Sequence, residues 1–198
     1  LSFSLSEAES LSCEQYCEQR GLTPYMFFAA AFGVFLSKLS GSKDFFVGTP
    51  VSSRRYPSVS ETAGLFVNTL PLRLTPKEGL TLADYLAAVK DTIVGLLDHP
   101  FFPLDEIVTL SGAERVQGQN PLYNTIISMR PVEVDGFTFA GQTAAPEPVP
   151  AKSAKVDLNL EVAKSGGCYQ FRLEYADHLF AADTVSLYSR SLITIVRE

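Results

Sequence analysis

The sequence predicts an α/β protein in which helices flank a mixed β-sheet. Residues 24–39 are apolar on nearly every side, which is typical of a buried helix, and residues 81–98 repeat apolar side chains with a 3.6-residue period. Residues 64–74 instead alternate with the two-residue period of a strand. Because 46% of the 198 residues are apolar, the chain can bury an ample core as one large or two small domains.

Capping signals place the helices. The capping residues are Ser6 with Glu9, Thr23 with Pro24, and Thr81. A short helix is expected from Pro103, with Leu104, Ile107 and Val108 facing inward. Helices are therefore expected over about 6–20, 23–39 and 81–98, from Pro103, and over 181–196.

Alternating segments between the helices predict the strands. These segments are 44–51, 64–74, 122–129, 156–162 and 169–175. The last two form an antiparallel hairpin with one wet face, turning at residues 165–167. Residues 56–63 are expected to form an irregular loop or a short helix. Residues 140–153 are rich in Ala, Pro and Gly without periodicity, so they predict a long exposed or bridging loop.

Composition excludes several classes of function. A net charge of −6 argues against nucleic-acid binding, and no apolar run reaches the length of a membrane span. No signal peptide is recognisable, and three cysteines suit a reducing cytoplasm rather than a disulfide framework. The chain starts without Met in a strand-like pattern and ends within an apolar periodic stretch. We therefore expect a piece of a longer cytoplasmic polypeptide.

Catalytic groups are few. The only histidines, His99 and His178, lack the Ser, Cys or carboxylate spacing of a triad, and Cys13 with Cys17 has no second pair of ligands for a metal. Neighbouring acids Asp105 and Glu106 suit the first turn of a helix better than acid–base work. The residues alone indicate an α/β binding fragment with no catalytic or metal-ligating residue of its own.

Asn68 is the exception within the strand over 64–74. It shares a row with apolar side chains, namely Phe66, Leu70, Leu72 and Leu74. A buried amide needs hydrogen-bond partners, so either Asn68 bonds to backbone in the core or it lines a cavity and bonds to a ligand. Pro71 cannot donate to a ladder, which predicts an edge strand or a bulge.

Residues 64–73, GLFVNTLPLR, resemble a segment of the condensation domains of nonribosomal peptide synthetases. Further segments resemble successive parts of the same family in the same order, namely 22–24, 47–54, 99–105, 115–123, 157–158 and 173–180. The resemblance implies one lobe of a two-lobed fold like that of chloramphenicol acetyltransferase. Residues 1–198 are then the C-terminal lobe, and the His-His-x-x-x-Asp-Gly catalytic motif belongs to an N-terminal lobe that this sequence lacks.

The resemblance also implies an activity. Such domains form amide bonds between aminoacyl or peptidyl thioesters carried on phosphopantetheine arms, so no cofactor is expected to bind this chain directly. The implied partners are the missing N-terminal lobe, donor and acceptor carrier proteins, and a neighbouring adenylation domain. The isolated fragment is expected to be inactive. Alternatives are a non-catalytic module that docks carrier proteins and a related acyltransferase.

Site residues follow from the matching positions. Those expected to line the substrate tunnel are Gly64, Phe66, Asn68, Thr69, His99 and Asn120. Arg54 and Arg73 are expected to contact phosphate groups or to form structural salt bridges. The loop over 140–153 is a candidate for the segment that such lobes send across to the first lobe.

Overall fold

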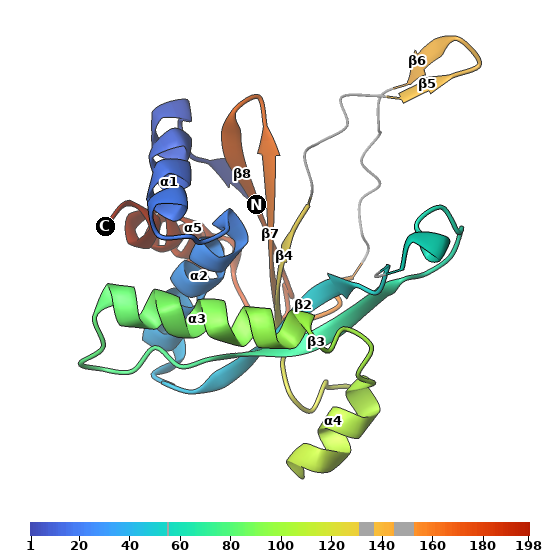
Figure 1. Cartoon of the computed structure of the whole chain (residues 1–198). Coiled ribbons are helices and arrows are strands. Elements are labelled where there is room, and N and C mark those ends of the chain that lie inside the picture. Colours follow the sequence, from blue (N-terminus) through green and yellow to red (C-terminus); the bar gives the residue numbers. More distant parts are fainter. Residues whose placement is uncertain (55, 131–136, 145–152) are drawn as a thin grey trace.

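In the computed structural model, which describes residues 1–54, 56–130, 137–144 and 153–198, helices pack against one face of a large mixed sheet (Figure 1). The helices are α1 (Glu7–Gln19), α2 (Pro24–Ser40), the 3₁₀ helix η1 (Pro57–Val59), α3 (Leu82–Leu97), α4 (Leu104–Ser111) and α5 (Ala182–Arg197). The strands are β1 (Ser2–Ser4), β2 (Phe45–Ser52), β3 (Val67–Leu74), β4 (Thr125–Met129), β5 (Phe137–Phe139), β6 (Gln142–Ala144), β7 (Leu158–Ser165) and β8 (Cys168–Tyr175). The predicted α/β class with a mixed sheet is confirmed.

The sheet has the strand order β1-β8-β7-β4-β2-β3. Strand β4 runs parallel to both β2 and β7, whereas the β1–β8, β7–β8 and β2–β3 pairs are antiparallel. Strand β3 lies at one edge, which confirms the position inferred from Pro71. Because side chains alternate across a strand, one face of the sheet is apolar under the helices and the opposite, open face carries the polar residues.

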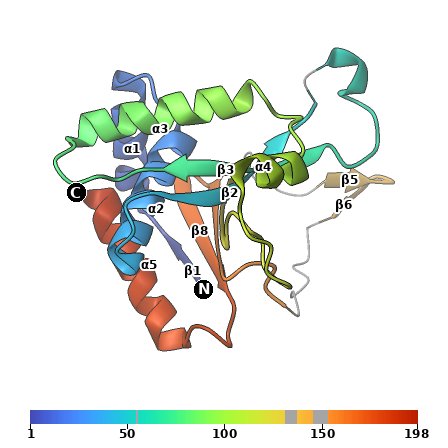
Figure 2. The ribbon, with the colours of Figure 1, turned by 90° about the horizontal axis from the view of Figure 1, so that it is seen from below.

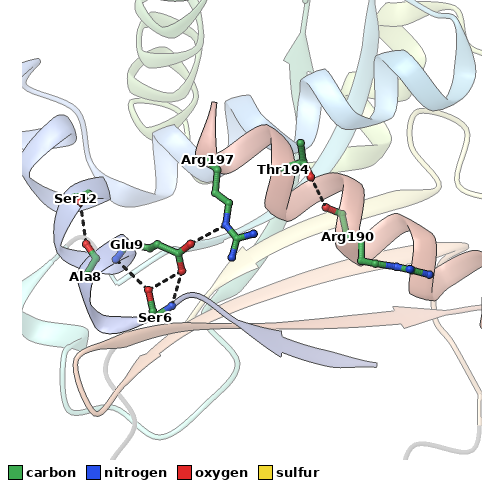
Figure 3. A network of polar contacts seen from close by, with 7 residues as sticks. All are labelled: Ser6, Ala8, Glu9, Ser12, Arg190, Thr194 and Arg197. Atoms are coloured by element: carbon green, nitrogen blue, oxygen red, sulfur yellow. Dashed lines mark hydrogen bonds and ion pairs between the residues drawn. The ribbon is translucent and has the colours of Figure 1, made fainter.

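The caps form as the sequence predicts. The Ser6 hydroxyl accepts from the Glu9 amide while the Glu9 carboxylate accepts from the Ser6 amide, and the Thr23 hydroxyl accepts from Met26. Gly41 ends α2 in the left-handed conformation at φ 75°. Glu9 also accepts a hydrogen bond from Nε of Arg197, 2.7 Å away, which ties α1 to the last turn of α5 (Figure 3).

Helix α2 is the centre of the core. It contacts α1, α3 and α5, and Figure 2 shows α3 running alongside β3. Phe28 of α2 meets Tyr169 and Phe171 of β8 edge-to-face, at ring distances of 4.8 and 5.2 Å. Among the described residues, no single helix is long and apolar enough to cross a membrane. Helices α1 and α2 pass such a test only together, across a bend of 104°, and most of α2 is buried here.

Several boundaries differ from the predictions by one to three residues. Strand β3 begins at Val67 rather than Gly64, and β4 begins at Thr125 because residues 120–123 form a turn. Part of the predicted loop over 140–153 forms β6, which pairs with β5 just before that loop. The turn residues of this hairpin, Ala140 and Gly141, both have positive φ. Residues 145–152 of that loop lie outside the described residues. Residues 56–63, predicted as an irregular loop or a short helix, contain the 3₁₀ helix η1.

Candidate functional site

The Asn68 side chain forms hydrogen bonds with backbone carbonyl groups. Its Nδ2 atom donates to the carbonyl oxygens of Pro100 and Phe102, each 3.1 Å away. These carbonyls belong to the turn that follows α3, and this turn also contains His99, whose side chain is exposed. Of the two interpretations of Asn68, the structure shows the backbone-bonded one. Asn68 therefore fastens the turn at 99–102 to the edge strand.

Arg54 holds the loop that leads into β3. Its guanidinium donates to the carbonyls of Val59 and Ser60 at 2.5 and 3.1 Å, and it lies over the Phe66 ring at 4.2 Å. A longer contact of 3.5 Å reaches the carbonyl of Gly64. The structure thus brings three predicted site residues, Arg54, Gly64 and Phe66, into one cluster. The arginine acts there as a structural clamp.

Exposed apolar side chains gather around these two clamps. We call this set the apolar rim: Tyr56, Leu65, Val67, Phe101 and Phe102. The rings of Tyr56 and Phe101 stack at 6.3 Å, which joins the loop over 53–66 to the turn after α3. Leu65 is 89% exposed. Apolar side chains that stay in water at one place on a surface mark a site where another molecule or domain packs.

A second cluster lies where β2 passes β4. The Asn120 side chain accepts from the amides of Leu122 and Tyr123 at 3.0 and 3.3 Å, which orients the turn before β4. The Tyr123 ring then lies against Gly48, where an added Cβ would come within 2.5 Å of the ring. Thr69 of β3 pairs with Pro50, two residues further along β2. No sequence pattern indicated Tyr123 as a site residue, although a glycine inside a strand is a signal for such close approach.

A pair of hydroxyl groups that the sequence patterns did not indicate joins α2 to β2. The Tyr25 hydroxyl at the start of α2 hydrogen-bonds the Thr49 hydroxyl, and Thr49 is buried. Burial raises the pKa of Tyr25 to about 12, with the bond to Thr49 acting in the opposite direction. Tyr25 therefore stays neutral at physiological pH and serves as a hydrogen-bonding group.

Arg73 lies apart from the other predicted residues. Five residues along the strand place it about 17 Å from Asn68. Its guanidinium binds the Asp44 carboxylate through two hydrogen bonds of 2.6 and 2.8 Å, and these hold the pKa of Asp44 below its usual value. Of the two roles expected for Arg73, the structure shows the salt bridge.

No acid–base centre is assembled by the described residues. Neither His99 nor His178 makes a side-chain hydrogen bond with a described residue. The described residues also contain no group of three side chains that could hold a metal ion. Cys13 and Cys17 are buried free thiols, and burial raises the pKa of Cys17 to about 11. The contacts described above hold backbone segments in place, and the described residues do not pair a nucleophile with a base.

The sequence and the fold match a known family. The family model for the condensation domain matches residues 1–198, which is the whole chain. This chain belongs to the condensation-domain family. It is 35% identical over 190 residues to surfactin synthase subunit 1 of Bacillus subtilis (strain 168), covering 96% of this chain and 5% of the relative. It is 36% identical over 184 residues to tyrocidine synthase 3 of Brevibacillus parabrevis, covering 93% and 3%.

Solved condensation domains share this fold, which is that of chloramphenicol acetyltransferase. The condensation domain of the monacolin K polyketide synthase MokA superposes with a TM-score of 0.83 at 21% identity, covering 99% of this chain and 45% of that one. The four-domain nonribosomal peptide synthetase holo-AB3403, bound to AMP and glycine, gives a TM-score of 0.87 at 22% identity. It is matched over all of this chain and 16% of its own. The chain thus spans less than a tenth of these curated relatives and under half of the MokA condensation domain.

Proposed function

We propose that this condensation-family chain is the C-terminal lobe of a nonribosomal peptide synthetase condensation domain. One observation carries the proposal: the whole chain matches the family, yet it spans only 45% of the MokA condensation domain. A lobe of this kind contributes one wall of the tunnel in which the amide bond forms. The proton-handling His-His-x-x-x-Asp-Gly motif then lies on the other lobe.

The reaction joins two thioesters presented on phosphopantetheine arms. The amine nitrogen of the acceptor attacks the donor carbonyl, a C–N bond forms, the C–S bond breaks, and the amine proton leaves toward a base or the departing thiolate. A positioned histidine typically contributes about 10²–10⁴-fold to such a step. Alignment of amine and carbonyl supplies a further part, and this alignment is the role assigned to the C-terminal lobe.

Within this lobe, the tunnel wall is assigned to the start of β3 and the segments clamped to it. Asn68 acts as a positioning residue for the turn at 99–102, because both of its donors are engaged there. Gly64 and Phe66, just before β3, and Thr69, within it, are assigned to the same wall. Asn120 is assigned an indirect role through Tyr123. The apolar rim is assigned to contact with the N-terminal lobe, since burying such side chains is favourable.

The remaining partners are donor and acceptor carrier proteins and an adenylation domain. Relatives such as tyrocidine synthase 3 are synthetases of which this chain matches only 3%. The β5–β6 hairpin stands away from the six-stranded sheet (Figure 1). We assign this hairpin, which overlaps the start of the loop predicted over residues 140–153, to the segment that crosses to the first lobe.

Reconstitution tests this proposal. The chain alone, supplied with two loaded carrier proteins, should release no amide product detectable by mass spectrometry. The longer polypeptide that includes the upstream lobe should form product, and replacing its second motif histidine by alanine should abolish turnover. Product formation by residues 1–198 alone would overturn the missing-base assignment.

A non-catalytic docking module is the second candidate. It is favoured by the absence of any assembled acid–base centre among the described residues. The same fold occurs in the X-domain in complex with OxyB from teicoplanin biosynthesis, at a TM-score of 0.86 and 18% identity. An intact His-His-x-x-x-Asp-Gly motif in the upstream sequence favours the enzyme, and a degenerate one favours the docking module.

A further inference from the structure

A polar hollow of about 420 Å³ lies on the open face of the sheet, opposite the helices. Its lining comes from β1, β7 and β8, together with Arg130, the residue that follows β4. Polar or charged residues make up most of the lining, namely Ser2, Ser4, Gln170, Arg172, Glu161 and Arg130. The remaining lining residues are Ala163, Phe3 and Phe171. Its volume falls within the range of small-molecule pockets, about 300–1,000 Å³.

The strand register explains the hollow. Arg172 of β8 lies directly opposite Ser2 on one side and Glu161 on the other, and Gln170 lies opposite Ser4 and Ala163. Side chains directly opposite each other in a sheet share one face. Serine and alanine are short, so the long Arg172 side chain has neighbours that leave space around its guanidinium.

The charges in the hollow are unequal. Arg130 donates to the Glu161 carboxylate at 2.6 Å, so this carboxylate already has a cationic partner. Arg172 makes no side-chain hydrogen bond or ion pair with any residue that the structure describes. Among the side chains that line the hollow, two guanidinium groups accompany one carboxylate, which leaves one net positive charge. Arg172 carries this charge, with Ser2 directly opposite on β1 and Gln170 two residues earlier on β8.

We propose that this hollow, on the sheet face away from the helices, binds a single carboxylate group through Arg172. A guanidinium offers two parallel N–H donors that match a planar carboxylate. One negative charge balances the site while the Arg130–Glu161 pair stays intact, whereas a doubly charged phosphate would have to compete with Glu161 for Arg130. The Gln170 amide and the serine hydroxyls offer additional donors at the same place. This site is separate from the apolar rim and does not depend on the proposed amide-forming reaction.

Nuclear magnetic resonance of the arginine Nε–Hε groups tests the proposal directly. The whole chain is titrated with sodium acetate at constant ionic strength, with sodium chloride as the reference salt. The Arg172 signal should move along a saturable curve while the Arg190 signal, on α5, stays in place. A linear shift, or equal shifts of both arginines, would overturn the site. Tighter binding of inorganic phosphate than of acetate would overturn the assignment to a carboxylate.

Charge-matched variants give predictions of opposite sign. Arg172→Gln should weaken acetate binding by about tenfold or more, because a charge-assisted hydrogen-bond pair is lost. Glu161→Gln should strengthen binding by roughly threefold, because it removes the competing carboxylate. Arg190→Gln and Glu18→Gln make the same charge changes on helices and should leave binding unchanged. If the matched variants alter affinity equally, general surface charge explains the binding and the site is refuted.

A further experiment tests whether the N-terminal ammonium group, rather than Arg172, binds the carboxylate. The Leu1 ammonium donates to the Leu173 carbonyl at 3.0 Å, close to Arg172, so the N-acetylated chain should retain saturable binding. Loss of binding on acetylation would overturn the role of Arg172.

A second ligand identifies the source of the carboxylate. The α-amide of N-acetylaspartate keeps only the side-chain carboxylate and so presents it as a protein side chain does. If it binds more tightly than acetate, the natural ligand is an acidic side chain; the reverse order indicates a small carboxylic acid, and either order supports the site.

Discussion

The helix-covered face of the sheet and the apolar rim at the start of β3 are held together by different forces. Under the helices, Phe28 and its aromatic neighbours are almost fully buried, and their stability comes from removing apolar surface from water. At the rim, apolar side chains remain exposed and the backbone is held by directed hydrogen bonds from Asn68 and Arg54. The buried core thus contributes most of the stability of the fold. At the apolar rim, hydrogen bonds fix the backbone while the apolar side chains stay exposed for contact with another surface.

Truncation of a core aromatic should give the largest effect. Phe28→Ala should lower the free energy of unfolding by about 3–5 kcal/mol, because the ring is 1% exposed and its removal leaves a cavity among packed side chains. Phe101→Ala in the apolar rim removes the same ring where it is 49% exposed and should cost less than about 1 kcal/mol. Urea denaturation compares the two. Equal losses would show that the rim is as much a part of the core as α2.

The contact between Gly48 and Tyr123 should be next in size. Gly48→Ala places a Cβ within 2.5 Å of the ring and should lower the free energy of unfolding by about 1–3 kcal/mol. Gly95→Ala in α3 meets no atom within 4 Å and should instead raise it by up to about 1 kcal/mol. Thermal unfolding followed by circular dichroism measures both. A neutral Gly48→Ala would mean that Tyr123 moves aside without cost.

The Asn68 clamp should have a smaller and more local effect. Asn68→Ala leaves the Pro100 and Phe102 carbonyls without their donor and should cost about 1–2 kcal/mol. The Phe102 N–H donates to the backbone carbonyl oxygen of His99 at 3.3 Å, and its hydrogen exchange should accelerate in this variant. Asn124→Ala removes an exposed bond to Asp157 and should leave exchange at Phe102 unchanged. Unaltered exchange in Asn68→Ala would contradict the positioning role.

The exposed Glu9–Arg197 pair should have the smallest effect, and this effect should depend on pH. Hydrogen bonds from the Ser6 amide and hydroxyl, together with Arg197, lower the pKa of Glu9 from 4.5 to about 2 (Figure 3). A lowered pKa in the folded state contributes stability above pH 4.5, and this contribution is lost as the pH falls toward 2. Glu9→Gln should therefore lower the melting temperature at pH 7, and the difference from wild type should vanish near pH 2.

A control separates this pair from general charge effects. Glu18→Gln on the same helix makes the same charge change without an ion pair to α5, so its difference from wild type should not follow that pH dependence. A Glu9→Gln difference that persists unchanged at pH 2 would contradict the assigned ionisation.

Local signals predicted the framework well. The pattern of Ser6 and Glu9, the Thr23-Pro24 start and the Gly41 stop each involve residues a few positions apart, and each forms as expected. The β5–β6 hairpin was missed because its strands have three residues each, too short for an alternating pattern to stand out. The family resemblance indicated which residues belong to the site. It did not indicate which groups their side chains bind.

By itself, the sequence determined the helices, most of the strands and the buried face of each, because periodicity and capping act between neighbouring residues. Only the tertiary structure decided that Asn68 binds carbonyls 32 and 34 residues away, that Tyr123 covers Gly48, and that Arg172 stands without a partner among the described residues. Side-chain alternation states which face a residue occupies. The order and register of the strands, which no local pattern encodes, decide what it meets there.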